Sequence, residues 1–367
     1  MKIIAVMLYS GVGSNSYENT MMVRCLDSLQ GFIDGCIVLD TGGTEFIKDL
    51  QKKYKFHLYH SPWTGHFAKH RNEALEYAKA EYPEEDLMWL IIDPDESLVE
   101  PEVGFEEAKN RLAKTSSLAT GLAVLVHEVN PDGERTASWR GIRFFKKASN
   151  LRYKNIIHNK PVIDGNAAMT NVEINHYGYS YQEDKKQEKW ERTNKNLKEL
   201  IGEDSRDHRT CYYLSQNSAS LRRYEEAIFW GIRAIQYFPY PDDPTKLNFY
   251  GGIYYTLGMT YARIGNAEES YRWLHHGLSL FPDDLDLNFA MALVGIRALR
   301  KDLFMPHAEK YLELLDDCRK PAQPKTFASA INQEDYLERN IHHITEEAER
   351  EIRHCMEHWD ELEEEAA

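Results

Sequence analysis

The pattern of apolar and polar positions along the chain changes character near residue 180. Before that point, short apolar runs alternate with helical segments and with turns rich in small polar residues. The apolar runs lie at residues 3–8, 36–39 and 89–92. Runs of this length that end in turn residues are typical of buried strands, and strands that alternate with helices predict an α/β fold. We therefore expect a sheet within the first 180 residues.

After residue 180 the pattern is helical. Residues 182–200 carry six Lys or Arg side chains interleaved with acids, which is typical of a linker helix with a solvated face. A motif then occurs twice, in residues 213–239 and 256–282, and each copy ends in Phe-Pro. Ala227 and Ser270 occupy the same place in the two copies. Small residues there would let paired helices approach closely.

The duplicated motif resembles the tetratricopeptide repeat, whose helix pairs stack and bury a shared face. The two copies are offset by 43 residues instead of the usual ~34, and an inserted loop that begins at residues 240–244 accounts for the difference. A degenerate third unit runs from Leu287 to Leu315. The resemblance predicts an all-α repeat domain at 206–367, joined by a linker helix at 181–205 to a first domain at 1–180. Repeats of this type bind peptides or support oligomers, and helices that only buttress a catalytic domain would show the same pattern.

Length and composition fit this organisation. A chain of 367 residues is long enough for two domains, each with its own core. The five cysteines are odd in number and show no paired spacing, which indicates reduced thiols. No apolar run reaches the ~18 residues of a membrane span. These features predict a cytoplasmic protein without a membrane span.

The formal net charge of −15 is distributed unevenly. Residues 331–367 hold 13 acidic and three basic side chains, and apolar residues at helical spacing within them predict a helix that caps the repeats. Residues 135–200 hold 14 basic and seven acidic side chains. Because basic side chains are concentrated in this stretch, the net acidic charge of the chain does not exclude an anionic substrate.

Three carboxylates at the end of a predicted strand are the strongest candidates for chemistry. Asp93, Asp95 and Glu96 follow the apolar run 89–92 directly. Ligands of open α/β sheets bind at the carboxyl ends of the strands, and clustered carboxylates there are costly unless a cation neutralises them. Oxygen ligands suit Mg²⁺ or Mn²⁺, which leave coordination positions open for phosphate oxygens. A strand followed by a plain acidic turn would look the same.

Two further segments have the composition that a nucleotide site needs. The strand at 36–39 ends in Asp40-Thr41-Gly42-Gly43, where a carboxylate could hold a ribose or base edge and small residues let backbone amides approach a phosphate. Arg71 and Asn72 lie near the start of the next helix. Arg71 could form a fork to a diphosphate, and Asn72 could orient a carboxylate. Taken alone, the two segments also fit a strand-to-helix turn and a solvated helix start.

In this order and spacing, the three segments resemble motifs of the family-2 glycosyltransferases with the GT-A fold. A subgroup of that family carries Asp-Thr-Gly-Ser-Thr, then Phe-x-x-x-Arg-Asn-x-Ala, then Asp-Ala-Asp-Glu. The corresponding segments here begin at Asp40, Phe67 and Asp93. The resemblance covers roughly residues 1–180 and implies a Rossmann-like mixed sheet. It also implies inverting transfer of a sugar from a nucleotide-sugar donor, UDP-linked in most such enzymes, with Mn²⁺ or Mg²⁺ as the cofactor.

The late part of this domain matches the family less closely. The family often carries a His-Glu pair, and here His158 is followed by Asn159, which leaves the general base open. A second signature is intact in residues 174–179 and makes His176 a candidate metal ligand. The candidate residues implied by the resemblance are, for catalysis, Asp164, His158 and Glu96; for the donor, Asp40, Thr41, Arg71, Asn72 and Asp93; and for the metal, Asp93, Asp95 and His176. Among the catalytic candidates, Asp164 is the proposed base, and Glu96 more readily orients the loop or a sugar hydroxyl.

The acceptor is the least determined part of the prediction. A saccharide or another glycoconjugate, anionic ones included, is the expected partner because most of this family act on such acceptors. Hydroxymethylated bases of phage DNA and a peptide are alternatives, and the repeats allow peptide binding or self-association. The rival hypothesis is a non-catalytic interaction protein whose function lies in the repeats.

Overall fold

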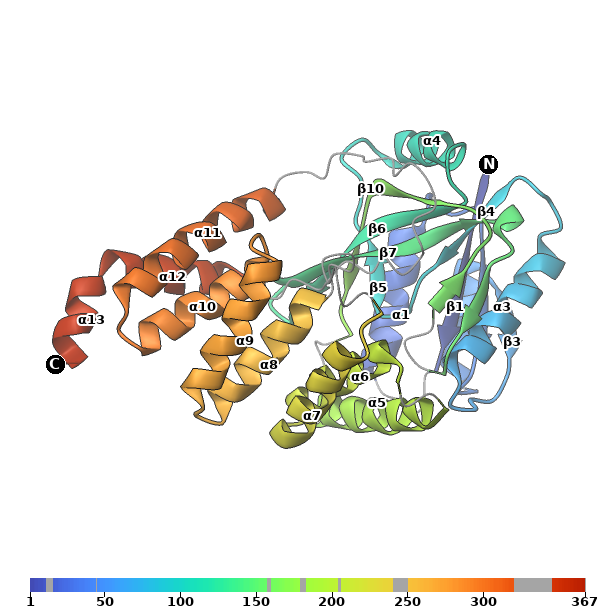
Figure 1. Cartoon of the computed structure of the whole chain (residues 1–367). Helices are drawn as coiled ribbons and strands as arrows, with labels where there is room; N and C mark the ends of the chain where they lie inside the picture. Colours follow the sequence, from blue (N-terminus) through green and yellow to red (C-terminus); the bar gives the residue numbers. More distant parts are fainter. Residues whose placement is uncertain are drawn as a thin grey trace. The chain divides into compact units, whose positions relative to one another are not determined.

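A computed structural model describes most of the chain in two compact units (Figure 1). The described residues are 1–10, 16–43, 45–156, 160–178, 183–203, 206–239, 250–319 and 345–366. The first unit contains Met1–Asp132 and Arg140–Ser180, and the second contains Gly133–Trp139, Tyr181–Pro321 and Leu337–Ala367.

An eight-stranded sheet forms the centre of the first unit, in the order β3-β2-β1-β4-β7-β6-β10-β5 (Figure 1). β1, β2, β3 and β4 are parallel, β7 runs antiparallel to β4, β10 runs parallel to β6, and β5 runs antiparallel to β10. The strands are β1 (Lys2–Tyr9), β2 (Gly35–Asp40), β3 (His57–His60), β4 (Leu87–Ile91), β5 (Glu96–Leu98), β6 (Gly121–Val129), β7 (Arg135–Lys146) and β10 (Ala167–His176). β8 (Arg152–Lys154) and β9 (Lys160–Val162) form a separate two-stranded sheet. The α/β character predicted for this part of the chain is confirmed.

Apolar side chains pack against both faces of the large sheet. Successive residues of a strand point to opposite faces, so two neighbouring residues of β7 illustrate both. Phe145 of β7 joins the apolar cluster with Ala74 and Leu75 of α3 (Phe67–Glu81). The preceding residue, Phe144, contacts Phe32 with 6.2 Å between the ring centroids. Phe32 in turn lies 5.5 Å from Phe105 of α4 (Phe105–Ser116). The other helices of this unit are α1 (Ser16–Leu29) and α2 (Glu45–Tyr54).

The second unit consists mainly of helices that follow one another in pairs. The pairs are α6 (His208–Ser220) with α7 (Tyr224–Gln236), α8 (Gly251–Arg263) with α9 (Ala267–Leu280), and α10 (Leu285–Arg297) with α11 (Lys301–Arg319). These pairs correspond to the two predicted repeats and the degenerate third unit. The predicted helical region of tetratricopeptide type is therefore present.

Small residues let the paired helices approach closely, as the sequence predicted. Ala227 and Ser270 are buried. Glycines also allow close approach between α8 and α9. A Cβ atom added at Gly258 would lie 2.5 Å from Leu274 Cγ, and one added at Gly277 would lie 2.7 Å from Tyr254 Cβ. Side-chain caps begin two of the helices, because Asn266 accepts from the backbone N–H of Glu269 and Asp284 accepts from that of Leu287.

The segment predicted as a linker is α5 (Glu183–Glu203), and it is packed within the second unit. Asn217 of α6 donates to the backbone carbonyl of Trp190 at 2.8 Å, and the side chains of Asn194 and Ser218 are 3.3 Å apart. Leu197 is fully buried. α5 therefore contributes to the core of the helical unit as well as presenting charged side chains.

Two helices, α12 (Glu346–Glu357) and α13 (Trp359–Ala366), stand where one capping helix was expected. Ile352 and Trp359 are buried against α10 and α11, and the Trp359 ring stacks on Phe304 with 4.9 Å between centroids. The predicted cover of the array is present, although the helix breaks at His358. Residues 320–344, which include the start of the predicted helix, lie outside the described residues. Among the described helices, none combines the length and apolar character needed to cross a membrane.

Candidate functional site

The loop after β4 is a tight turn that two hydrogen bonds between Asp93 and Glu96 close. The backbone N–H of Glu96 donates to the carbonyl of Asp93 at 2.9 Å, which makes Asp93–Glu96 a four-residue turn. Pro94 stands second in that turn, where its fixed φ is favoured. The backbone N–H of Asp93 donates to Glu96 Oε2, also at 2.9 Å. Pro94 therefore stiffens the loop.

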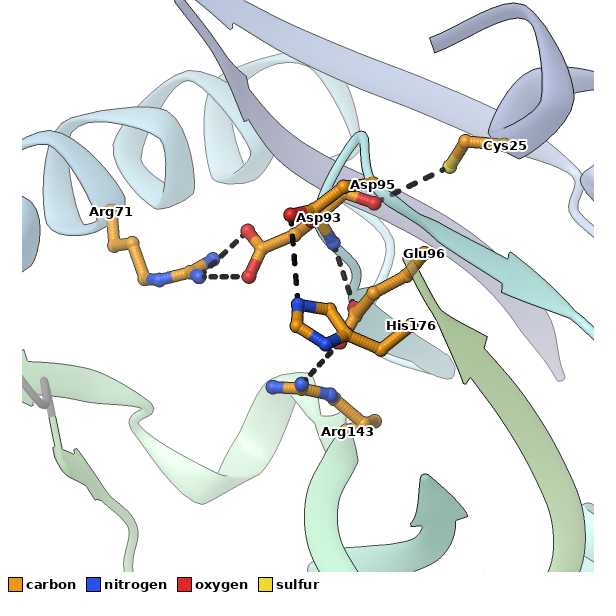
Figure 2. A network of polar contacts seen from close by, with 7 residues as sticks. All are labelled: Cys25, Arg71, Asp93, Asp95, Glu96, Arg143 and His176. Atoms are coloured by element: carbon orange, nitrogen blue, oxygen red, sulfur yellow. Dashed lines mark hydrogen bonds and ion pairs between the residues drawn. The ribbon is translucent and has the colours of Figure 1, made fainter. Parts of the chain in front are cut away.

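Glu96 holds the loop. Its side chain is 1% exposed, and its second oxygen lies 2.5 Å from Arg143 Nη2 on β7 (Figure 2). Burial raises the pKa of Glu96, while Arg143 acts in the opposite direction and favours the charged form. Both carboxylate oxygens are engaged in contacts that hold the turn, and a catalytic role of Glu96 stays a prediction.

Arg71 engages Asp93. Its Nη2 atom lies 2.8 Å and 3.0 Å from the two carboxylate oxygens of Asp93 (Figure 2). The Arg71 side chain is 8% exposed. One terminal nitrogen of the predicted fork is therefore engaged by a residue of the chain itself, and diphosphate binding by Arg71 stays a prediction. This contact also takes up the carboxylate of Asp93, which was predicted to bind both donor and metal.

Asp95 and His176, which are 81 residues apart, meet because of strand pairing. β10 runs antiparallel to β5, with His176 opposite Glu96, and the backbone N–H of Tyr177 donates to the Asp95 carbonyl at 2.8 Å. His176 Nε2 then lies 3.5 Å from Asp95 Oδ2 (Figure 2). Gly178 lies directly against this pair, where there is no room for a side chain. A Cβ atom there would lie 2.5 Å from Asp95 Oδ2 and 2.6 Å from His176 Nε2.

Asp95 and His176 are two of the predicted metal ligands, and the structure brings them together. Among the described residues, no group of three or more His, Cys, Asp or Glu side chains has the arrangement of a metal site. The predicted set of Asp93, Asp95 and His176 is thus reduced to Asp95 and His176, because Asp93 is held by Arg71. Mg²⁺ commonly uses one or two protein ligands together with substrate phosphates.

Asp40 and Thr41 shape the loop after β2. Asp40 accepts hydrogen bonds from the backbone N–H groups of Gly42 and Gly43, each at 3.0 Å, and is 4% exposed. Gly43 has a φ of +74°, which favours glycine in that position. Thr41 donates through its hydroxyl to the carbonyl of Tyr9 at 3.1 Å. These contacts explain the loop, and direct donor contacts of the two side chains remain a prediction.

Asn72 ties α3 to β8. Its amide nitrogen donates to the Tyr153 carbonyl at 3.0 Å, and its amide oxygen accepts from the Tyr153 N–H at 2.7 Å. The Tyr153 ring lies 5.4 Å from the Arg71 guanidinium, and burial raises the pKa of Tyr153 to about 12. The predicted donor-binding role of Asn72 is corrected, because both ends of its amide serve the backbone of β8.

The proposed base, Asp164, lies at the wrong end of the sheet. It follows β9, is exposed, and accepts from Asn150 at 2.7 Å. Its backbone carbonyl accepts from Thr120, just before β6 begins. Ala167 pairs with the first residue of β6, whereas His176 pairs near its end. A ten-residue strand at ~3.3 Å per residue separates the two ends by roughly 25–30 Å, which excludes Asp164 as the base. His158 lies outside the described residues.

The sequence prediction missed residues that have no motif of their own. Arg143 neutralises Glu96, and Arg24 of α1 lies 4.3 Å from the centre of the Tyr177 ring, next to His176. Cys25 donates through its thiol to the Asp93 carbonyl at 3.6 Å, and burial raises its pKa. Of these residues, only Tyr177 could have been found from the sequence, because it lies within the signature at residues 174–179.

Comparisons with known proteins bear chiefly on the repeats. No protein-family model matches the chain. A TPR repeat-containing protein of Synechococcus elongatus is 25% identical over 206 residues, which cover 53% of this chain and 48% of that protein. The chain thus spans about half the length of that relative.

Two solved structures align with a part of the chain at low similarity. The crystal structure of MamA aligns with 35% of this chain and 70% of its own, at 19% identity and a TM-score of 0.31. YrrB, described as a TPR protein with an unusual peptide-binding site, aligns with 35% of this chain and 62% of its own, at 15% identity and a TM-score of 0.30.

Proposed function

We propose that the first unit is a metal-dependent glycosyltransferase that uses a nucleotide-sugar donor. The observation that carries the proposal is the pairing of Asp95 with His176, against which Gly178 packs without a side chain. This pair lies at the carboxyl end of β4, where open α/β sheets bind their ligands. The side chains of Asp95 and His176 are 24% and 14% exposed, respectively. A charged ligand could therefore reach them from solvent.

The surrounding residues prepare this pair for a charged ligand. Arg143 and Glu96 fix the turn, and Arg71 neutralises Asp93, so that Asp95 carries the carboxylate directed at His176. Asp95 and His176 would hold Mn²⁺ or Mg²⁺, which would neutralise charge on the departing nucleoside diphosphate. The turn is therefore preorganised before any ligand binds, which lowers the cost of ordering it.

The donor and acceptor follow from the same proposal. A UDP-sugar is the expected donor, and a saccharide or other glycoconjugate is the expected acceptor. Inverting transfer needs one base, because the acceptor attacks the anomeric carbon from the face opposite the diphosphate. Hydroxymethylated bases of phage DNA and a peptide remain the alternative acceptors.

Calorimetry with UDP tests the proposal directly. We expect UDP to bind more tightly with Mn²⁺ than in EDTA, and Asp95→Asn to remove that difference. The matched control is Asp86→Asn, because Asp86 precedes β4 at the opposite end of the same strand and is 89% exposed. Equal UDP affinity with and without Mn²⁺ in the unaltered protein would refute the metal-dependent site.

We propose as a second candidate that the repeats supply the function through binding of a peptide or another copy of the chain. The relative from Synechococcus elongatus supports this candidate, since it is named for its TPR repeats. Phe229 of α7 is 47% exposed and lies under Arg233, 4.3 Å from its guanidinium carbon to the ring centre. Sedimentation velocity of the full chain tests self-association. A concentration-dependent dimer that Phe229→Glu abolishes, without metal-dependent UDP binding, would favour this candidate over the first.

A further inference from the structure

Two histidines lie next to each other where the last two helices of the second unit meet. His354 belongs to the last turn of α12, and His358 stands at the break between α12 and α13. Residues four positions apart lie on the same side of a helix. The two imidazole rings accordingly have 4.4 Å between their centroids and 35° between their planes. His354 is exposed and His358 is half-buried, so solvent reaches the pair.

A hydrogen bond fixes the orientation of His358 and the nitrogen that carries its proton. The Nδ1 atom of His358 lies 3.0 Å from the backbone carbonyl oxygen of His354. A carbonyl oxygen can only accept, so Nδ1 donates, and the neutral ring keeps its lone pair on Nε2. Metal-bound histidines commonly donate their second ring N–H to a backbone carbonyl in this way. The ring of His358 is therefore held in the form that a metal ion requires.

The nitrogens that would bind a metal ion are not engaged elsewhere. Within the described part of the chain, neither Nε2 of His358 nor the two ring nitrogens of His354 have a hydrogen-bond or ion-pair partner. The pair differs in this respect from His127, whose Nε2 atom lies 3.2 Å from a carboxylate oxygen of Glu173. A metal ion would break no contact of the two rings on binding.

The charge around the pair favours a cation. The last carbonyl groups of α12 lie at this end of the helix, where the helix dipole places partial negative charge. Residues 345–367 hold ten acidic and two basic side chains. Clustered charge of one sign raises the local concentration of counter-ions. Arg353, the residue directly before His354, is itself paired with Glu349 at 2.8 Å. A divalent ion is thus attracted to the two rings.

We propose that His354 and His358 form a binding site for a divalent transition-metal ion such as Zn²⁺, separate from the Asp95 site and independent of the function proposed above. Imidazole nitrogen suits Zn²⁺, Ni²⁺ and Cu²⁺, whereas Mg²⁺ and Mn²⁺ prefer oxygen ligands. Histidines at positions i and i+4 of a helix bind Zn²⁺ together in metalloproteases. No third His, Cys, Asp or Glu of the described residues completes a metal-binding group, so two of the four Zn²⁺ positions stay open to water. The ion links the last turn of α12 to the helix break and stabilises the junction with α13.

Calorimetry of the full chain with Zn²⁺, at about pH 7.5 in a buffer that does not bind metals, tests the site. We expect His354→Gln and His358→Gln each to weaken the binding of one equivalent of Zn²⁺ about 10-fold or more, because loss of even a hydrogen-bond partner of a metal ligand typically costs 10–100-fold in affinity. Zn²⁺ should raise the thermal midpoint of the unaltered protein more than that of either variant, since an ion that binds only the folded state stabilises it.

The matched control is His275→Gln, which should bind Zn²⁺ as tightly as the unaltered protein. His275 is also exposed on a helix, but the ring four residues before it is that of Tyr271, 5.6 Å away between centroids. Electron paramagnetic resonance with one equivalent of Cu²⁺ counts the imidazole nitrogens bound to the ion. We expect two in the unaltered protein and fewer in His354→Gln.

Unchanged Zn²⁺ affinity in either His354→Gln or His358→Gln would overturn the two-histidine site, because both rings are required to chelate the ion. An equal loss in His275→Gln would show unspecific binding to surface histidines and would also overturn it. A Cu²⁺ spectrum with a single coordinated nitrogen in the unaltered protein would have the same meaning.

Discussion

At the scale of single residues, the site depends on two ion pairs, each with one buried partner, that join distant parts of the chain. Arg71 neutralises Asp93 and Arg143 neutralises Glu96. Removing one partner of a buried pair leaves an uncompensated charge, which costs far more than the pair contributes when intact. These arginines therefore set the shape of the loop that presents Asp95.

Arg143→Met should destabilise the first unit by about 3 kcal/mol at neutral pH, because it leaves the Glu96 carboxylate buried and unpaired. Burial already raises the pKa of Glu96, and loss of Arg143 should raise it further. A carboxyl whose pKa is higher in the folded state takes up protons on folding, so stability falls as pH rises through that pKa. The destabilisation should consequently shrink as the pH is lowered towards 4.5, the ordinary value for Glu.

Urea unfolding of both proteins at neutral and mildly acidic pH measures this difference. Arg111→Met is the control, because Arg111 pairs with Glu107 on the surface of α4 with about half of each side chain exposed. Its effect should be small at every pH. A destabilisation by Arg143→Met that does not change with pH would show that Glu96 is not the group left unpaired.

Gly178→Ala should remove metal-dependent UDP binding while the first unit remains folded. The added Cβ atom would lie 2.5 Å from Asp95 Oδ2 and 2.6 Å from His176 Nε2, so the two side chains that are proposed to hold the cation would have to shift. Calorimetry with UDP and Mn²⁺ measures the effect. Gly202→Ala, where an added Cβ atom meets nothing within 4 Å, is the matched control. Unchanged binding in Gly178→Ala would place the ligand elsewhere.

At the scale of elements, the helix pairs of the second unit depend on close backbone approach. Gly258 of α8 faces Leu274 of α9, and an added Cβ atom would lie 2.5 Å from Leu274 Cγ. Insertion of a methyl group into a packed interface typically costs about 1–3 kcal/mol. Gly258→Ala should lower the thermal midpoint of the protein for this reason.

The same substitution at Gly202 of α5 should instead raise the thermal midpoint. The added methyl group meets open space there, and alanine is favoured over glycine in helices by up to about 1 kcal/mol. Differential scanning calorimetry of the two variants compares them directly. An increase in midpoint for both would mean that α8 and α9 can separate without cost.

At the scale of the whole molecule, charge predicts how ionic strength acts on the ligands. The chain carries a net charge of −15, with an excess of basic residues between 135 and 200. UDP affinity with Mn²⁺ should change little between about 50 mM and about 200 mM salt, because a short-range contact with a cation is screened less than diffuse charge. A polyanionic acceptor would instead bind far more weakly at the higher concentration.

A duplex DNA fragment serves as the polyanionic probe in competition with donor hydrolysis. We expect no competition, in agreement with a saccharide or glycoconjugate acceptor. Competition that disappears as salt is raised would instead favour the modified-DNA alternative.

The sequence alone determined those features that are encoded by neighbouring residues. Apolar runs placed β1, β2 and β4, the turn chemistry of Asp93-Pro94-Asp95-Glu96 located the loop, and the duplicated motif located the helix pairs. Strand periodicity, turn preference and helix pairing are local properties, so they can be recognised without knowledge of the fold.

Only the tertiary structure decided which of these residues meet. β5 pairs with β10 and thereby brings Asp95 to His176, and β7 brings Arg143 to Glu96, contacts that no local pattern encodes. The same topology separates Asp164 from the site, although Asp164 is closer in sequence to His176 than Asp95 is. Strand order and register are set by long-range pairing and burial, and they determine whether a carboxylate faces a ligand, an arginine or solvent.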